Sequence, residues 1–365
     1  MDFTLSAEQQ LLKDSVARFA TDRRNAHGDV WASFAQLGWL AIGAPEGAGG
    51  FGGPVETLLI AEQLGRGLIV SPYVAQAVFA GAILRACDRA DWLEASVEGR
   101  RRFTVAYEEP HARYDPSAVR TTARRDGDGW VLYGSKVRVS DASSADTVLL
   151  SARTGGGIAL FALPAHARGL TAAGYPSEDG YDVADLHLDG VRVDDDALVA
   201  PPGDGLETLE YGIDNATAAL CAEALGLCAV MLEMTVDYTK TRTQFGVPLS
   251  SFQALSHRMA EMYVELELLR SMAFYAAMTL ETENDSFERK RGISAAKAQV
   301  AKSGRFIGQQ AIQLHGGIGM SEEYDVGHYF KRMTLVERIF GDRDYHVRRY
   351  ADLSRLTVLL EPVSV

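Results

Sequence analysis

The run Gln313-Leu-His-Gly-Gly-Ile-Gly319 decides how the last third of the chain is organised. It closes a long helical pattern in which apolar residues recur every seven positions, at Ile293, Val300, Ile307 and Leu314. Such a repeat keeps one helix face against a neighbouring helix. Gly316 and Gly317 then end the helix, because glycine adopts the left-handed geometry that closes it. Alone, the run is either a simple helix stop or a site that exposes backbone amides beside a side-chain amide.

Three other helical patterns surround this one in the sequence. Apolar residues alternate spacings of four and three between Leu220 and Tyr238, and again between Leu255 and Leu280. A last helix is predicted near Tyr345–Leu360. Each of these helices carries one apolar stripe that needs a partner, so we predict an antiparallel four-helix bundle.

The middle of the chain has the pattern of a β-sheet. From Arg102 onward, short β-branched or alternating runs are separated by turn formers such as Asp126-Gly-Asp-Gly129. The predicted strands are Phe103–Tyr107, Trp130–Tyr133, Lys136–Val139, Thr147–Leu150, Ile158–Phe161 and Ala184–Leu188. Many short strands with regular turns indicate a small barrel or sandwich.

The segment before Arg102 is predicted to be helical. Ser6-Ala-Glu-Gln9 has the form of a capping box, in which the glutamine reaches back to the serine backbone. Further on, Gly47, Gly49 and Gly52 formally match the dinucleotide-binding pattern G-x-G-x-x-G. No clear strand precedes these glycines, and no acidic residue stands about 20 positions after them. We therefore predict a flexible loop, followed by a helix that starts near Pro54.

The order of these segments predicts an α+β protein with three domains. They are an all-α N-terminal domain (1–101), a middle β-barrel or sandwich domain (102–203) and a C-terminal antiparallel four-helix bundle (204–365). A length of 365 residues is enough for two or three domains with a sizeable core.

Composition excludes several classes of function. The net charge of −13, with no basic block to offset it, argues against a nucleic-acid binder. The eight histidines and three cysteines show no paired metal spacing, so no metal site is predicted. Neither a signal peptide nor an apolar run of about 18 residues is visible, so we expect a cytoplasmic protein without a membrane span.

Two motifs in the last third resemble the acyl-CoA dehydrogenase family. Arg242-Thr-Gln-Phe-Gly246, followed by Ser251-Phe-Gln-Ala-Leu-Ser-His257, looks like the family's R-x-x-F-G…F-Q-x-x-x-H stretch. Gln313–Gly319, followed by Tyr324 and Tyr329-Phe-Lys-Arg332, is similar to its Q-x-x-G-G-x-G…Y-x-R stretch. The three-part order of helices, strands and helices is also the order of that family.

The middle domain adds weaker similarities to the same family. Ala106-Tyr-Glu-Glu-Pro110 resembles its A-x-T-E-P, and Leu132-Tyr-Gly-Ser-Lys136 resembles its L-x-G-x-K. Ala145-Asp146 and Leu188-Asp-Gly-Val191 also stand where the family places them. The resemblance covers nearly the whole chain and implies FAD as cofactor. In the family, FAD lies between the middle domain and the bundle, and its adenine end crosses a subunit interface.

The resemblance implies a set of FAD contacts. Arg242 would pair with the pyrophosphate, because a planar, permanently charged guanidinium suits phosphate oxygens. Ser140 would keep a hydroxyl at the flavin-contacting threonine of the family's W-I-T. The remaining implied contacts are Phe245 and Gln253, with Gln313, Gly316 and Gly317 from a neighbouring subunit.

The family's reaction is the α,β-dehydrogenation of an acyl-CoA thioester, and an electron-transfer flavoprotein-type acceptor is the implied redox partner. A carboxylate removes the α-proton while the β-hydride passes to the flavin. Such a base needs a dry pocket that tunes its pKa toward neutrality. Family members form homo- or hetero-oligomers, so a dimer or tetramer is implied here.

This chain departs from the family at the base. The usual base precedes a glycine in an I-Y-E-G-T-x-x-x-Q-like stretch, which here reads Arg338-Ile-Phe-Gly-Asp-Arg-Asp-Tyr-His-Val347. Aligned without a gap, Gly341 stands at the base and Asp342 at the glycine. A second location used by some members aligns roughly with Ala216, which is no carboxylate either.

The flavin contacts depart from the family as well. Arg138 replaces the Trp of W-I-T, and Glu108 replaces the Thr of T-E-P. Arg343 and Val347 stand where the family's T-x-x-x-Q contacts the cofactor. Base and flavin contacts are therefore altered together.

Three hypotheses remain open. In one, Asp342 or nearby Asp214 is a displaced catalytic base in a homo-oligomeric dehydrogenase. In another, which we favour, the chain is one subunit of a heteromeric acyl-CoA dehydrogenase of the kind used on bulky steroid acyl chains, and its partner carries the base. In the last, the chain is a non-enzymatic scaffold or binding protein without flavin.

Overall fold

The computed structural model describes residues 4–23, 28–87, 89–283 and 285–354, which form two compact units. The helical unit lies within 1–27, 54–69 and 217–365, and the sheet unit within 28–53 and 70–216. The chain passes between the two units more than once. The three consecutive domains remain a prediction about segments of sequence.

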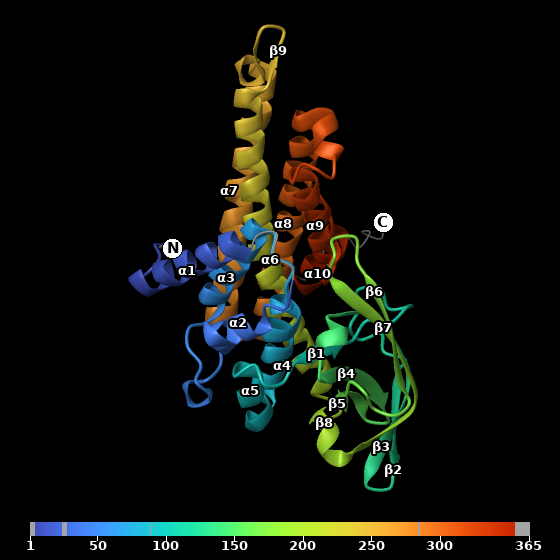
Figure 1. The fold of residues 1–365 in the computed structure, drawn as a ribbon. Coiled ribbons are helices and arrows are strands. Elements are labelled where there is room, and N and C mark those ends of the chain that lie inside the picture. The colour runs from blue at the N-terminus through green and yellow to red at the C-terminus, as the bar shows by residue number, and fades with distance from the viewer. Residues whose placement is uncertain (1–3, 24–27, 88, 284, 355–365) are drawn as a thin grey trace, which may run out of the picture. The chain divides into compact units, whose positions relative to one another are not determined.

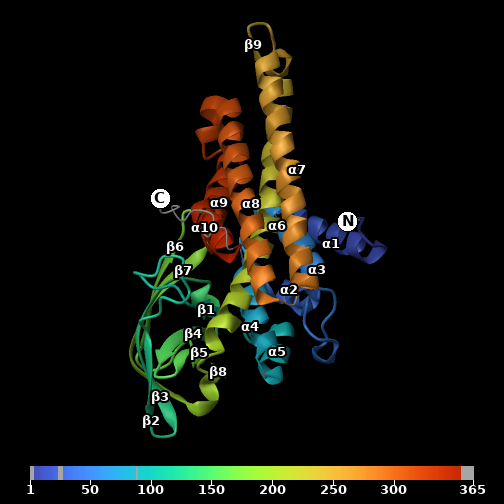
Figure 2. The same cartoon turned by 180° about the vertical axis from the view of Figure 1, so that it is seen from behind.

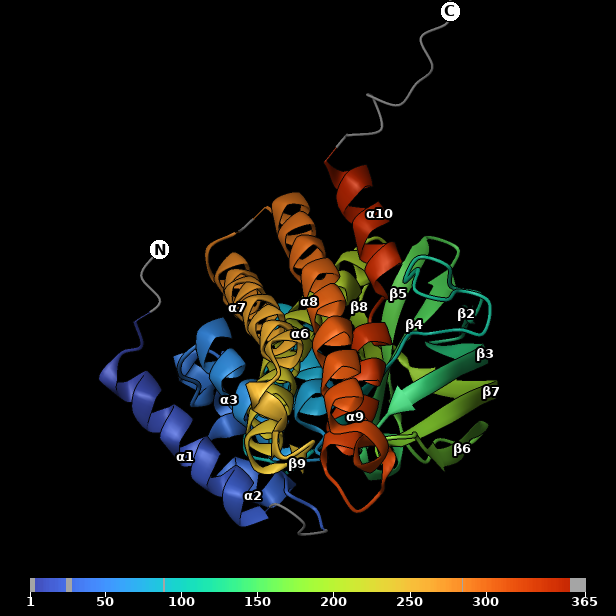
Figure 3. The same cartoon turned by 90° about the horizontal axis from the view of Figure 1, so that it is seen from above.

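Long helices build the helical unit. They are α1 (Ala7–Arg23), α3 (Pro54–Gly67), the greater part of α6 (Gly205–Thr241), α7 (Gln253–Thr282), α8 (Ser286–His315), α9 (Val326–Arg338) and α10 (Arg343–Leu353). Figure 3 shows α8 between α7 on one side and α9 and α10 on the other, and all three pack against it. Helix α3 packs on both α1 and α7.

Helix α8 is the centre of this packing, because its seven-residue apolar repeat gives it a continuous buried face. Asp285 caps its first turn by accepting a hydrogen bond from the Phe287 amide at 2.8 Å. Ile293, Val300 and Ile307 of the seven-residue repeat are at most 1% exposed. The predicted helical C-terminal domain is confirmed.

The end of the chain differs from the sequence prediction. Helix α9 was not predicted, because its buried face includes charged side chains such as Arg332 and Glu337 that interrupt the apolar stripe. Helix α10 begins at Arg343 and ends at Leu353. The last part of the helix predicted near Tyr345–Leu360 lies outside the described residues.

A small hairpin joins α6 to α7. It consists of β9 (Thr243–Gln244) and β10 (Val247–Pro248). Figures 1 and 2 show α6 and α7 side by side, with this hairpin at their common end. Phe245 and Gly246 form its two-residue turn, with φ of 55° and 83°. Positive φ at both positions is typical of the turn type that matches the twist of a hairpin.

One mixed sheet dominates the sheet unit. Its strands are β1 (Phe103–Ala106), β2 (Thr122–Asp126), β3 (Gly129–Ser140), β4 (Thr147–Thr154), β5 (Gly157–Pro164), β6 (Leu170–Pro176), β7 (Asp182–Asp194) and β8 (Leu198–Ala200). The order is β6-β7-β3-β2-β4-β5-β8, and β1 pairs in parallel with β4 (Figure 1). The predicted strands all appear, and two of them are halves of β3. Sequence reasoning missed β2, β6 and β8.

The remaining elements of the sheet unit are short helices. They are α2 (Trp31–Gln36), a π-helical segment (Tyr73–Ala80), α4 (Gly81–Ala86) and α5 (Ala90–Val97). The glycine-rich stretch contains a short 3-10 turn, Glu46–Ala48, and α3 starts after it at Pro54. This agrees with the predicted loop. The capping box is confirmed too, because Ser6 and Gln9 exchange hydrogen bonds of 3.0 and 3.1 Å.

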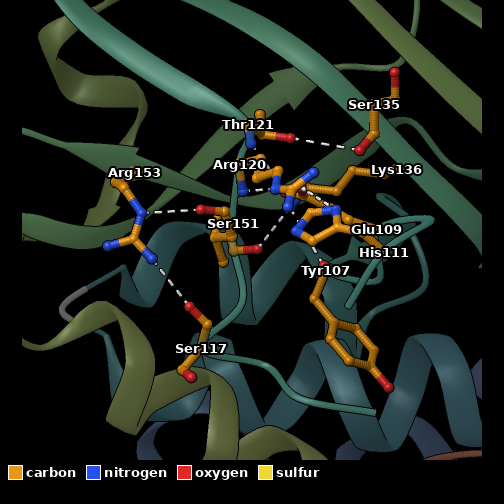
Figure 4. A network of polar contacts seen from close by, with 11 residues as sticks. Tyr107, Glu109, His111, Ser117, Arg120, Thr121, Ser135, Lys136, Ser151 and Arg153 are labelled. Atoms are coloured by element: carbon orange, nitrogen blue, oxygen red, sulfur yellow. Dashed lines mark hydrogen bonds and ion pairs between the residues drawn. The ribbon is translucent and has the colours of Figure 1, made fainter. Parts of the chain in front are cut away.

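A buried ion pair connects the segment after β1 to β3 and β4. Lys136 donates to Glu109 Oε1 at 2.7 Å and to Ser151 Oγ at 3.0 Å (Figure 4). Glu109 also accepts the backbone amides of Arg120 and Thr121 at 2.8 and 3.0 Å. Burial lowers the pKa of Lys136 to about 8. Each charge has partners, so we assign this pair a structural role.

Helix α6 is long and apolar enough to cross a membrane by length and composition alone. Of its most apolar window, 78% is buried inside the structure. That burial is typical of the core helix of a folded domain.

Candidate functional site

The first group of predicted site residues lies on and beside the α6–α7 hairpin. Arg242 is exposed directly after α6, and its carbonyl accepts the Leu249 amide at 2.8 Å. Phe245 is 91% exposed, and its ring meets that of Phe252 edge to face, with centroids 6.1 Å apart. Gln253 is exposed at the start of α7. This end of the helical unit therefore presents a guanidinium, an amide and two aromatic rings.

The second group lies at the end of α8. Gln313 is exposed on its last turn, and Gly316 and Gly317 follow in a short 3-10 turn (Gly316–Met320). Gly316 has φ of 64°, which explains why glycine ends the helix. Apart from the adjoining backbone, no heavy atom of the described residues lies within 4 Å of where a Cβ would stand on either glycine. A ligand can therefore approach the backbone closely at both residues.

An aromatic cluster brings these two groups to the same end of the helical unit. It consists of Tyr238, His315 and Tyr324. The His315 ring stacks on Tyr238 at 4.6 Å between centroids and lies 5.1 Å from Tyr324. Tyr238 belongs to the last turn of α6, since its carbonyl accepts the Arg242 amide at 2.8 Å. The C-terminal ends of α6 and α8 therefore meet, as expected for the first and third helices of an antiparallel bundle.

His315 supports this cluster through its own contacts. The side chain is buried, and its Nδ1 lies 2.8 Å from the carbonyl oxygen of Ala311 in the preceding turn. Burial lowers the pKa of His315 below its usual value. A neutral imidazole between two phenol rings holds the helix end in place.

Ser140 belongs to the sheet unit and is described there by itself. It is the last residue of β3 and pairs with Val183 of β7. Its carbonyl accepts a hydrogen bond from the Thr104 hydroxyl at 2.6 Å. The Ser140 side chain is half-buried, and its proposed contact with the cofactor stays a prediction.

Two departures from the family pattern are in contact with each other. Arg138 and Glu108 form an ion pair, and the Tyr107 hydroxyl donates to Glu108 at 3.1 Å. The register between β3 and β7 shifts between Lys136 and Val139, and Arg138 there takes φ of 53°. A bulge of this kind redirects a side chain. Burial raises the pKa of Glu108, and Arg138 opposes that shift. Sequence reasoning noted both residues but not their pairing.

Asp342 is the N-cap of α10. Its Oδ1 accepts the Tyr345 amide at 2.8 Å, and the side chain is half-buried. Gly341, just before it, has φ of 122°, a backbone conformation that residues other than glycine rarely adopt. The predicted catalytic carboxylate is thus engaged in holding a helix end.

This geometry favours a different register for the base motif. A glycine with positive φ followed by a helix cap matches the Gly-Thr of I-Y-E-G-T, with Gly341 as the glycine and Asp342 as the cap. Phe340 then stands at the base, one residue before the position expected from the ungapped alignment. His346 replaces the glutamine. It is buried, and its Nδ1 has no hydrogen-bond partner among the described residues.

A buried lysine lies close to this turn, and sequence reasoning missed it. Lys297 of α8 is 1% exposed and donates to the Val336 carbonyl. Burial lowers the pKa of Lys297 to about 8, and Cys221, Glu337 and Glu223 partly oppose the shift. The signal was a lysine within the apolar stripe of α8, where a charged residue needs an explanation.

Lys297→Met is expected to leave the chain equally or more stable at pH 7. The nearby acids keep their own partners, because Glu223 pairs with Arg332 and Glu337 with Arg305. In the wild type, the folded state releases the lysine proton near pH 8 and the unfolded state near 10.5. Stability should therefore rise between these values, by on the order of 3 kcal/mol at most, and the variant should lack that rise.

Urea unfolding at pH 7 and pH 9.5 measures this prediction. Lys302→Met, on the same helix but with half of its side chain exposed, is the matched control and should keep the rise. A Lys297→Met protein that is clearly less stable at pH 7 would contradict the argument.

Comparison with known proteins shows matches to one protein family along nearly the whole chain. The family model described as "Acyl-CoA dehydrogenase, N-terminal domain" matches residues 6–99, the middle-domain model 104–191 and the C-terminal-domain model 203–353. Acyl-CoA dehydrogenase FadE12 of Mycobacterium tuberculosis is 30% identical over 354 residues, which cover 89% of this chain and 90% of that protein.

Two solved structures show the same fold with recognisable sequence similarity. A variant of the Tcur3481-Tcur3483 steroid ACAD has a TM-score of 0.87 at 28% identity, covering 98% of this chain and 100% of that one. Glutaryl-CoA dehydrogenase from Mycobacterium smegmatis has a TM-score of 0.88 at 26% identity, with coverage of 97% and 96%.

Proposed function

This chain belongs to the acyl-CoA dehydrogenase family of FAD-dependent oxidoreductases, and from that premise we propose that it is one subunit of a heteromeric acyl-CoA dehydrogenase whose partner supplies the catalytic base. The reaction is the α,β-dehydrogenation of an acyl-CoA thioester. FAD, when bound, accepts the hydride that leaves the β-carbon. One observation carries the proposal: the residue directly before Gly341, where the family has its base, is Phe340 and not a carboxylate.

The residues at the end of the helical unit fit the adenine half of FAD. Arg242 is exposed and suits the pyrophosphate, because its guanidinium can donate two parallel hydrogen bonds to phosphate oxygens. Gln253 and Gln313 offer exposed amides for polar contacts with the nucleotide. Gly316 and Gly317 leave their backbone open to a ligand. Phe245, which is almost fully exposed in the single chain, supplies an aromatic surface.

The turn before α10 supports the proposal that a partner abstracts the proton. Phe340 occupies the position of the family's catalytic base, and its side chain cannot accept a proton. Asp342 is the nearest carboxylate in sequence, and it caps α10 through the Tyr345 amide. Moving it to a substrate would break that hydrogen bond and leave a helix N-terminus uncapped, at a cost of about 1 kcal/mol.

The sheet unit supports the same proposal. The Glu108–Arg138 ion pair occupies both positions at which the family pattern has uncharged flavin contacts. A charged pair that satisfies itself is a poor replacement for an indole and a hydroxyl. The structural neighbour with the two-part name Tcur3481-Tcur3483 is described as a steroid ACAD, which suggests a bulky acyl chain and a two-subunit arrangement here as well. An electron-transfer flavoprotein-type protein is the proposed electron acceptor.

A second candidate is a homo-oligomer in which Asp342 serves as a displaced base. Its position next to the family's base is the observation in its favour. The two candidates differ in what Asp342→Asn does. If Asp342 takes the α-proton, turnover should fall by about 10²- to 10⁴-fold.

The test is co-expression of this chain with a homologue encoded by a neighbouring gene. FAD content and acyl-CoA dehydrogenation are measured for the pair and for the chain alone. We expect a yellow, active pair in which Asp342→Asn changes turnover by about twofold or less, whereas removal of the partner's carboxylate lowers it by about 10²-fold or more. Arg242→Met should reduce FAD occupancy.

Three other outcomes would each reject one part of the proposed function. A large loss with Asp342→Asn would support the displaced base and overturn the heteromeric proposal. A colourless pair that takes up no FAD would leave the scaffold hypothesis standing instead. Full FAD occupancy in Arg242→Met would remove Arg242 from the cofactor site.

A further inference from the structure

Gln76 is a buried glutamine in the sheet unit. It lies in the π-helical segment Tyr73–Ala80 and is 0% exposed. Its Nε2 donates to the Asp141 carbonyl oxygen at 3.2 Å and to Ser144 Oγ at 3.0 Å. A carbonyl oxygen can only accept, so the contact with Asp141 fixes which end of the amide is the nitrogen. Within the part of the chain that the structure describes, Gln76 Oε1 has no hydrogen-bond partner.

The two acceptors of Gln76 belong to the turn that follows β3. Asp141 comes directly after Ser140, the last residue of β3, and takes φ of 53°. The Asp141 amide donates to the Asp182 carbonyl of β7 at 2.8 Å, and the Thr104 hydroxyl of β1 donates to the Ser140 carbonyl at 2.6 Å. Neighbouring strands therefore hold one side of this turn, and Gln76 ties its other side to a helical segment.

The same π-helical segment supports a second position of the implied flavin site. The Phe79 ring meets the Tyr107 ring edge to face, with centroids 5.8 Å apart. Tyr107 directly precedes Glu108, the residue at the threonine of the family's T-E-P. The segment thus contacts both stretches of the sheet unit, around Glu108 and Ser140, whose family counterparts meet the flavin. A π-helix is rare and is found frequently at functional sites.

Packing alone does not account for an amide at position 76. A buried acceptor such as Gln76 Oε1 costs free energy, because it loses its water and gains no donor in the folded chain. An apolar side chain of similar size, such as methionine, would avoid that cost. The amide differs from methionine by the two hydrogen bonds from Nε2, and both hold the turn that carries Ser140.

We propose that Gln76 is a positioning residue for FAD, which holds the turn after β3 so that the Ser140 hydroxyl meets the flavin. The proposal rests on the proposed function in one respect, since the contact between Ser140 and the flavin belongs to the implied FAD site. Gln76 acts through Asp141 and Ser144. Gln76→Met keeps the size of the side chain and removes both hydrogen bonds, so it should loosen the turn and weaken FAD binding.

The test is a double-mutant cycle on the complex of the full-length chain with its partner. FAD is removed and titrated back, and flavin fluorescence gives its dissociation constant for the wild type, Gln76→Met, Ser140→Ala and the double variant. We expect Gln76→Met to weaken FAD binding by about 3- to 30-fold, as for the loss of one or two buried hydrogen bonds. In the Ser140→Ala background the same change should have little further effect, because the hydroxyl that Gln76 positions is already gone.

Two further variants separate positioning from general stability. Ser144→Ala removes one acceptor of Gln76 and should weaken FAD binding by a smaller factor, so the proposal stays testable if Gln76→Met does not fold. Gln63→Met removes another buried glutamine, on α3 in the helical unit, and should leave FAD affinity unchanged. A Gln76→Met complex that melts at a lower temperature without FAD, but binds FAD as tightly as the wild type, would show a structural role and overturn the proposal.

The cycle gives a second way to overturn the proposal. If Gln76→Met weakens FAD binding equally with and without the Ser140 hydroxyl, Gln76 acts elsewhere. These outcomes are independent of turnover. A complex that shows the expected cycle but dehydrogenates no acyl-CoA would support the role of Gln76 and reject the proposed function. An active complex whose FAD affinity ignores Gln76 would do the reverse, and a complex that takes up no FAD would reject both.

Discussion

Gly341→Glu, the obvious attempt to restore the base by ungapped alignment, is expected to destabilise the chain by about 2–6 kcal/mol. Two costs add. Gly341 has φ of 122°, and forcing another residue into such a conformation costs about 1–3 kcal/mol. A Cβ there would also lie 2.4 Å from Cδ1 of Tyr345 and 2.7 Å from Nε2 of His346, and overpacking of this kind costs about another 1–3 kcal/mol. Urea unfolding followed by circular dichroism measures the loss.

Phe340→Glu is the matched variant for this prediction. Phe340 already carries a side chain at its φ of 59° and is half-buried, so glutamate there adds neither new backbone strain nor a new Cβ. We expect this variant to lose much less stability than Gly341→Glu. If the favoured register is right, only Phe340→Glu places a carboxylate at the base, and only it can rescue a complex whose partner has lost its own. Equal stability of the two variants would contradict the claim that the turn tolerates a side chain at position 340 but not at 341.

Glu223→Ala is expected to cost about 3–5 kcal/mol of the free energy of unfolding. Glu223 and Arg332 are both buried and are joined by two hydrogen bonds of 2.5 and 2.9 Å. Removing the acid leaves the guanidinium charged, buried and without its carboxylate. Lys297 adds to the penalty, because its nearby positive charge then loses one of the acids that stabilise it. Urea unfolding at pH 7 measures the effect.

The double variant Glu223→Met, Arg332→Met controls for the loss of the pair itself. Replacing a buried ion pair with apolar residues of similar size is often neutral or stabilising. We expect the double variant to be more stable than Glu223→Ala. Should the double variant lose as much as the sum of the two single variants, the buried charge would not be the source of the cost.

The sequence by itself determined the family and the local elements. The capping box at Ser6, the helix start at Pro54 and the seven-residue stripe of α8 depend on neighbours within a few residues. Short-range hydrogen bonding and side-chain periodicity fix these features, so they can be read along the chain. The motifs around Arg242 and Gln313 could be recognised for the same reason, because each is a continuous run.

Only the tertiary structure decided what those residues contact. It paired Arg138 with Glu108, buried Lys297 near acids, and gave Asp342, a candidate base, the contact of a helix cap. The partners in the first two cases are distant in sequence, and their energies depend on burial, which no local pattern reveals. The alignment of the turn before α10 with the family's base motif depended on one backbone angle, φ at Gly341. An ungapped alignment of the sequence does not contain that angle.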